Sequence, residues 1–80
     1  MEIEKSLNLT RKELVDLLKG IAGQLEAGGP VKSESLNAEV TPGEPIFVKL
    51  EYEDKYGQNK IEIDIHLVGQ SQPQTTPPKL

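Results

Sequence analysis

The stretch of sequence that decides the fold is IFVKLEYEDKYGQNKIEIDIHL, residues 46–67. Apolar and polar side chains alternate along residues 46–53 and again along residues 60–67, and this period of two is typical of strands that bury one face. Between the two runs, Tyr56-Gly57 can form a two-residue turn, because glycine adopts a positive φ at little cost. The segment therefore predicts an antiparallel β-hairpin.

The position of this turn also predicts the register of the hairpin. It places Leu50 opposite Ile63 and Val48 opposite Ile65. Apolar residues also meet at the two ends of this face, Ile46 with Leu67 and Tyr52 with Ile61. A slip by one residue would turn the isoleucines of one strand to water. We therefore expect one apolar face, which packs against the rest of the protein, and one polar face.

Residues 10–13, TRKE, form a capping box that predicts the start of a helix. In this motif the Thr10 hydroxyl accepts from the backbone N–H of Glu13, and the Glu13 carboxylate accepts from the N–H of Thr10. Apolar residues then recur at intervals of three and four, at Leu14, Leu17, Leu18, Ile21 and Leu25. This spacing predicts an amphipathic helix with one apolar stripe. The sequence AGGP at residues 27–30 predicts its end, since glycine takes the left-handed conformation and proline prevents continuation.

Shorter alternations predict further strands. Residues 2–9 are expected to form an edge strand, with Lys5 reaching from the inward side out to water. Residues 31–40 alternate in two phases, which predicts two short strands and a turn or bulge near Glu34 and Ser35.

Together these elements predict an α+β fold in the order β-α-β-β-β-β. The helix is expected to pack on one face of an antiparallel sheet of about four to five strands, in two layers. We expect a single domain over residues 1–68. Residues 69–80, GQSQPQTTPPKL, are polar and rich in proline, which predicts a disordered tail.

The composition restricts the classes of function. The chain has 80 residues, which is near the lower limit for a hydrophobic core that is stable by itself. It has no cysteine, so it cannot use thiolate catalysis or a Cys-based zinc site, and this fits a cytoplasmic location. No apolar run approaches the length of a membrane span. The net charge of −4 disfavours nucleic acid as the main partner.

Three segments carry a family resemblance: LNLTRKELVDLLKGIAGQLEAGG, TPGEPIFVKLEYE and KIEIDIHL. In their pattern and order the chain resembles the amphi-Trp domain family, a small prokaryotic module of unknown function, over roughly residues 1–68. The resemblance implies a small α+β fold with no established activity, so it transfers no catalytic residue. The final strand of the family typically ends in tryptophan, and Leu67 stands at that place here.

The polar face of the hairpin is the candidate interaction surface, with Phe47, Lys49, Glu51, Glu62, Asp64, His66 and Val68 on it. Asp64 and His66 could share a metal ion only if Glu62 stretched past Asp64 to join them, because a zinc site uses three or four protein ligands. Lys49 beside Asp64 would repel a cation. Glu51 and Glu62 lie opposite each other but lack the burial that acid–base catalysis by paired carboxylates needs. We therefore expect no metal, no other cofactor, no catalytic residue and no enzymatic activity.

These observations favour a non-enzymatic interaction or accessory module that acts through an exposed strand edge or through the polar sheet face. Its partner would be protein, either another protein or a second copy in a weak homodimer, and we expect no membrane association. The alternative is a weak nucleic-acid or anion-binding domain that uses Arg11, Lys12 and Lys19 near the helix start. The sequence does not identify the partner or the ligand.

Overall fold

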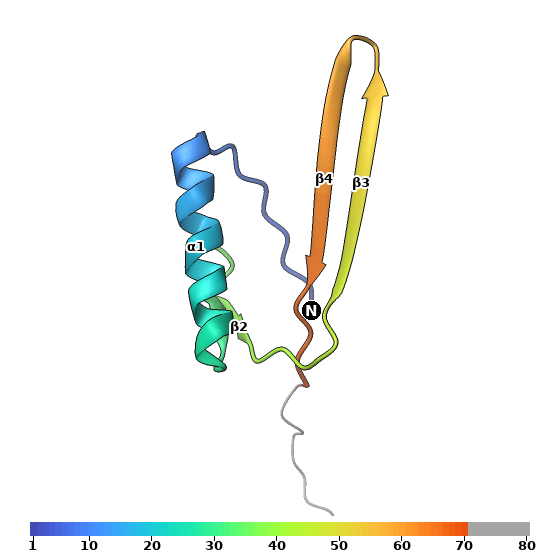
Figure 1. The fold of residues 1–80 in the computed structure, drawn as a ribbon. Coiled ribbons are helices and arrows are strands. Elements are labelled where there is room, and N and C mark those ends of the chain that lie inside the picture. The colour runs from blue at the N-terminus through green and yellow to red at the C-terminus, as the bar shows by residue number, and fades with distance from the viewer. Residues whose placement is uncertain (71–80) are drawn as a thin grey trace, which may run out of the picture. The chain divides into compact units, whose positions relative to one another are not determined.

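The computed structural model describes residues 1–70 and divides the chain into two compact units, Met1–Thr41 and Pro42–Leu80. The first contains α1 (Arg11–Ala27), β1 (Val31–Ser33) and β2 (Ala38–Val40), and the second contains β3 (Phe47–Lys55) and β4 (Gln58–His66) (Figure 1). The predicted α+β class is confirmed: the described residues contain one helix and two antiparallel two-stranded sheets, β1-β2 and β3-β4.

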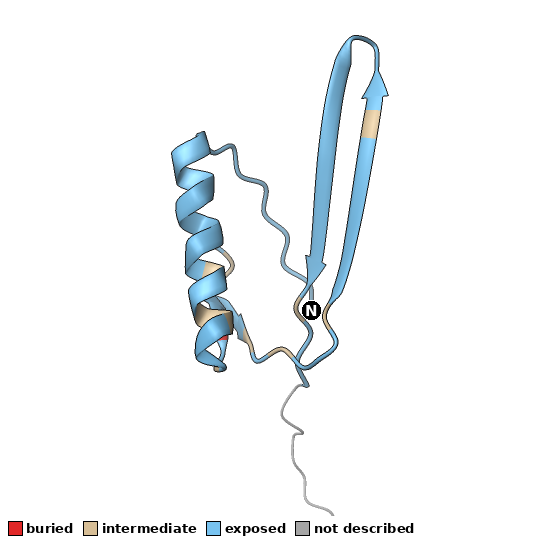
Figure 2. Cartoon of the chain, in the orientation of Figure 1, coloured by how far each residue is buried: buried red, intermediate tan, exposed pale blue. Residues whose placement is uncertain are grey.

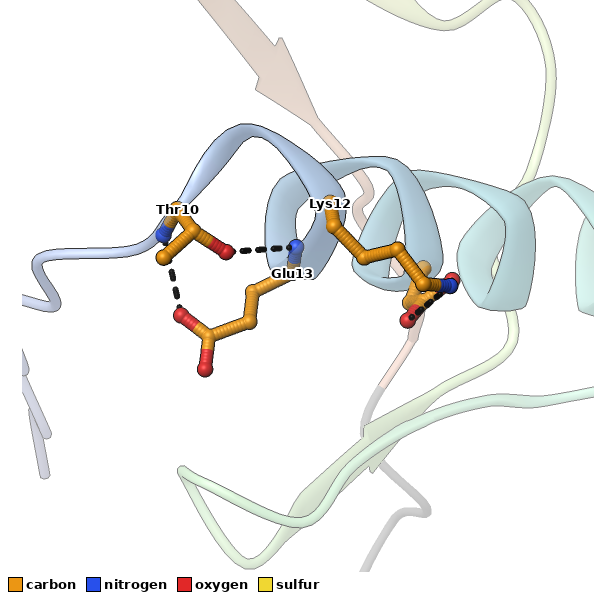
Figure 3. Close-up of polar contacts among 4 residues, drawn as sticks. Thr10, Lys12 and Glu13 are labelled. Carbon is orange, nitrogen blue, oxygen red and sulfur yellow. Dashed lines mark hydrogen bonds and ion pairs between the residues drawn. The ribbon is translucent and has the colours of Figure 1, made fainter.

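The capping box at the start of α1 is confirmed. The Thr10 hydroxyl accepts from the backbone N–H of Glu13 at 3.1 Å, and the Glu13 carboxylate accepts from the N–H of Thr10 at 2.9 Å (Figure 3). Two of the N–H groups that a helix start leaves without partners are therefore satisfied. The helix ends at Gly28, which has φ 80° and donates its N–H to the carbonyl of Leu25.

The two short strands predicted within residues 31–40 are also present. Val31 pairs with Val40 in the β1-β2 sheet, and the chain turns between Ser33 and Ala38. Asn37 takes a positive φ of 52° in this turn, which asparagine tolerates better than most residues. The Ser33 hydroxyl accepts from the N–H of Leu36 at 3.2 Å. The predicted turn near residues 34 and 35 is therefore confirmed.

The small apolar core of the first unit lies where α1 packs against β1. Val31 is the one buried residue among those the structure describes, with 8% of its surface exposed (Figure 2). Half-buried apolar residues of the same unit are Ile21, Leu25, Leu36 and Val40. The first half of the helix stripe is more exposed, as the 45% value for Leu14 shows. Only the C-terminal half of the stripe contributes to this core.

A side chain of α1 also covers the edge of β1. The Gln24 amide oxygen accepts from the backbone N–H of Lys32 at 2.8 Å, and its amide nitrogen donates to the Lys32 carbonyl at 3.4 Å. Gln24 thus satisfies both backbone groups of one residue, as a neighbouring strand would.

In the second unit, β3 and β4 form the predicted hairpin in the predicted register. Leu50 pairs with Ile63, Val48 pairs with Ile65, and the ladder runs from Phe47 opposite His66 to Lys55 opposite Gln58. Tyr56 and Gly57 connect the strands with φ values of 53° and 75°. Two consecutive positive φ values define the type I′ turn, whose twist matches that of the flanking strands.

Residues 2–9 do not form the strand that we expected, and this prediction is wrong. The segment has no regular structure and precedes α1 directly. Its alternation places Lys5 on the side of Ile3 and Leu7, and burying that side would remove the ammonium group from water. Instead the Lys5 Nζ donates to the carbonyl of Ser35 at 3.4 Å.

The four strands that follow the helix form two sheets of two strands rather than one larger sheet. The expected packing of the helix on a face of the hairpin, and the single domain over residues 1–68, stay predictions. The tail predicted for residues 69–80 lies outside the described residues from residue 71 onward. Among residues 1–70, no helix is long and apolar enough to cross a membrane.

Candidate functional site

The polar face of the hairpin places the predicted surface residues in two facing rows. Phe47 lies opposite His66, Lys49 opposite Asp64, and Glu51 opposite Glu62. Because one turn fixes the whole ladder, the two-residue loop that sets the register also sets these pairs. The structure therefore brings together all the predicted surface residues of the two strands.

One end of this face is aromatic. The rings of Phe47 and His66 have their centroids 5.0 Å apart and are tilted by 56°, a separation that suits an attractive ring pair. His66 Nε2 also lies 3.5 Å from an oxygen of Asp64. Val68 follows the strand, is 68% exposed, and accepts the N–H of Gly43 at its carbonyl. This end of the hairpin offers an exposed apolar group beside a polar pair.

The other end of the polar face holds two ion pairs between glutamate and lysine. Glu53 lies 3.0 Å from the ammonium of Lys55 and 3.6 Å from that of Lys60. Lys49 and Glu51, in the middle of β3, form no ion pair with any side chain of residues 1–70. Their charges are therefore available to a partner.

A hollow of about 340 Å³ lies at the middle of the hairpin. Its lining residues are Lys49, Glu51, Glu62, Ile63 and Asp64. All of them are exposed, so water screens their charges. In residues 1–70 no three His, Asp or Glu side chains are placed to hold a metal ion together. These side chains can therefore exchange their contacts with water for ionic contacts with the charged groups of a partner.

The opposite face of the hairpin is apolar and exposed. Its six central side chains expose between 46% and 70% of their surface: Val48, Leu50, Tyr52, Ile61, Ile63 and Ile65. At about 150–200 Å² per side chain they expose roughly 600 Å² together, the upper end of the range for the largest apolar patch of a soluble monomer. Among the described residues of its own unit, 42–70, no other element packs on this face.

The edges of the hairpin are the third feature of the site. In the described part of the chain, β3 and β4 pair with each other and with no other strand. Each is nine residues long and leaves one row of backbone N–H and C=O groups without a strand partner. Such rows bind added strands.

The alternation of an antiparallel ladder shows which groups point outward. A two-residue turn is closed by a hydrogen-bonded pair, here Lys55 with Gln58, and bonded and non-bonded pairs then alternate along the strands. Counted from the turn, the even-numbered residues of β3 point their backbone groups to the free edge. These are Val48, Leu50, Tyr52 and Asp54.

The residues of the alternative anion site are less closely grouped. Lys12 lies 3.3 Å from Asp16, in an ion pair one turn apart on α1 (Figure 3). Lys19 is seven residues beyond Lys12, about 10 Å along the axis at 1.5 Å per residue. Arg11 precedes Lys12 and points to another side of the helix, since consecutive residues are about 100° apart. Asp16 lies between the lysines, so an anion would meet a carboxylate there.

The charges of the site were predictable from the sequence. The cover over the edge of β1 in the first unit was not: Gln24 of α1 closes that edge through Lys32. No spacing rule reveals this contact, because it depends on how the chain returns after Gly28. The outward backbone groups of β3 were predictable, since they follow from the turn position alone.

The chain matches no family model, no curated protein and no solved structure. The class that the structure itself defines is an α+β protein, with one helix and two antiparallel hairpins in residues 1–70. The resemblance to the amphi-Trp domain family stays a prediction.

Proposed function

We propose that this chain is a non-enzymatic protein-interaction module that binds an extended segment of its partner along a free edge of the β3–β4 hairpin. The observation that carries the proposal is the pair of nine-residue strands that have no other strand beside them among residues 1–70. Main-chain hydrogen bonds would provide affinity, and alternate side chains of the added strand would provide specificity.

The contrast with the first unit supports this choice. There Gln24 occupies the edge of β1, which is only three residues long. Among residues 1–70, no side chain covers the long strands of the hairpin in this way. Natural proteins usually shorten, cover or interrupt the edges that they do not use.

The side chains that flank the edge define the chemistry of the bound segment. An added strand beside β3 would face Lys49, Glu51 and Glu53 on one side of the sheet and Leu50 with Tyr52 on the other. Cross-strand pairs of opposite charge and apolar pairs are the favourable combinations. The bound segment is therefore expected to alternate apolar residues with charged residues of both signs.

A displayed library of random ten-residue peptides tests the proposal. Selection against the whole chain should enrich peptides with this alternation, and titration with a selected peptide should shift the backbone NMR signals of β3 or β4. Proline at alternate positions of the same peptide should abolish binding, because proline cannot donate to a ladder. Peptides that bind elsewhere on the chain, or that tolerate these prolines, would contradict binding by strand addition.

A further inference from the structure

The free edge of β3 carries side chains that are complementary to a second copy of itself. When a strand pairs antiparallel with its own copy, each residue lies opposite the residue equally far beyond the two-fold centre. With the centre at Leu50, Lys49 lies opposite Glu51 of the second copy, and Glu51 lies opposite the second Lys49. Symmetry therefore makes this favourable charge pair twice.

The apolar side of the same register is equally consistent. Leu50 meets Leu50 of the second copy, and Val48 meets Tyr52 in two symmetric pairs. Large aliphatic and aromatic residues are good cross-strand neighbours. These three residues also point their backbone groups to the free edge, so each pair can exchange two hydrogen bonds, about six in all.

Centres at Tyr52 and Glu51 place like charges together, and a centre at Val48 sets Lys49 against Phe47 without any pair of opposite charge. A centre at Tyr52 sets Lys49 against Lys55 and Glu51 against Glu53. A centre at Glu51 joins Lys49 to Glu53, but it sets the two copies of Glu51 directly opposite each other. Like charges in facing positions destabilise a sheet, so these registers are weaker than the one centred at Leu50.

The edge of β4 offers poorer matches. A centre at Ile65 sets Asp64 against His66, but these two side chains already lie 3.5 Å apart in their own strand. A centre at Ile63 sets Glu62 against Asp64, and a centre at Glu62 sets that carboxylate against its own copy. A centre at Ile61 does pair Lys60 with Glu62, but it also places Asn59 against Ile63.

Lys60 is in addition already within 3.6 Å of Glu53 in its own hairpin. In contrast, Lys49 and Glu51 make no ion pair with residues 1–70. The charges on the β3 edge are therefore free to pair across a two-fold axis, whereas those on β4 are partly engaged.

From this complementarity we infer that the partner at the β3 edge is a second copy of this chain, paired antiparallel about a two-fold axis at Leu50. The product is a four-stranded sheet in the order β4-β3-β3-β4. It joins two apolar faces of roughly 600 Å² each into one continuous face. The inference rests on the proposed function, since it names the occupant of the edge that the function requires.

Two charge reversals of the same size test the inference. Glu51→Lys and Glu62→Lys each replace the Glu51–Glu62 pair inside the hairpin with a pair of opposite charge, and each changes the net charge equally. Only Glu51→Lys also sets lysine against Lys49 of the second copy, twice. Sedimentation equilibrium from about 1 µM to 1 mM should show at least about tenfold weaker dimerisation for Glu51→Lys. Glu62→Lys should dimerise like the unchanged chain.

A mixture of two variants provides the rescue. Lys49→Glu places glutamate against Glu51, and Glu51→Lys places lysine against Lys49, so each variant alone should dimerise poorly. In an equal mixture every such pair has opposite charges, and heterodimers should form with the affinity of the unchanged chain. Circular dichroism of each variant checks that the strands are retained. If Lys49→Glu does not fold, the comparison of Glu51→Lys with Glu62→Lys still tests the inference.

Three results would overturn the inference: an unchanged chain that stays monomeric to 1 mM, equal effects of Glu51→Lys and Glu62→Lys, or a larger effect of Glu62→Lys. None of these would overturn the proposed function if library peptides still bind a hairpin edge. Conversely, the library peptides could fail to bind while Glu51→Lys still weakens a dimer. That pair of results would mean that the edge binds a second copy of the chain and no other extended segment. The peptide selection and the sedimentation of the charge variants can therefore contradict the proposed function and this inference independently.

Discussion

The turn of the hairpin provides the sharpest prediction about stability. Gly57 has φ 75°, and a Cβ built on it would have no atom within 4 Å. Gly57→Ala therefore creates no clash with a neighbour, and its whole cost is that of holding an L-residue in the left-handed region. That cost is about 1–2 kcal/mol, or roughly a 5- to 30-fold change in the opening equilibrium.

Amide hydrogen exchange followed by NMR measures this change locally. Gly57→Ala should accelerate exchange of the protected β3 and β4 amides by that factor. Gly23→Ala is the matched control, since a Cβ there also meets nothing within 4 Å and the residue lies inside α1 without a positive φ. This substitution should stabilise α1 by up to about 1 kcal/mol and so slow the exchange of the helix amides. Unchanged or slower exchange in the hairpin of Gly57→Ala would refute the assignment of the type I′ turn.

Two further substitutions test local structure. Tyr56→Asn should stabilise the hairpin by about 0.5–1 kcal/mol and so slow its amide exchange, because asparagine is favoured in this turn. Tyr56 has φ 53° there and is 95% exposed. Faster exchange would show that the phenol ring has a role in the turn. Thr10→Ala should destabilise α1 by about 1 kcal/mol, because it removes the hydroxyl that accepts from the N–H of Glu13. Thr10→Ser keeps a hydroxyl and should leave the helix content, measured by circular dichroism, unchanged. Equal helix content in the two variants would contradict the role of the cap.

Local features of the fold were predictable because they depend on neighbouring residues. The capping box at Thr10 and the turn at Tyr56 and Gly57 each follow from residues that are near one another in the sequence. The pairing of Leu50 with Ile63 then follows from the turn, because a slip by one residue would reverse the faces.

Features that depend on distant parts of the chain were harder to predict. The apolar alternation in residues 2–9 resembles a strand, but a strand exists only with a partner for its backbone groups. Gln24 has the spacing of a solvent-facing helix residue, and its contacts with Lys32 arise only once β1 has turned back along α1. For the candidate site, the sequence placed the charged rows, while the free charges of Lys49 and Glu51 emerged only from the ion pairs of the structure.

Disulfide trapping tests the central claim, that β3 pairs with its own copy, most directly. The chain contains no cysteine, so Leu50→Cys introduces a single thiol at the proposed two-fold centre. Paired residues in an antiparallel sheet have Cα atoms about 5.5 Å apart, which suits a disulfide. Ile63→Cys is the control, because in the proposed sheet its two copies lie three strand spacings apart, about 14 Å. Mild oxidation should link Leu50→Cys into a dimer rapidly and leave Ile63→Cys largely monomeric, whereas equal linking of the two variants, or faster linking of Ile63→Cys, would contradict pairing through β3.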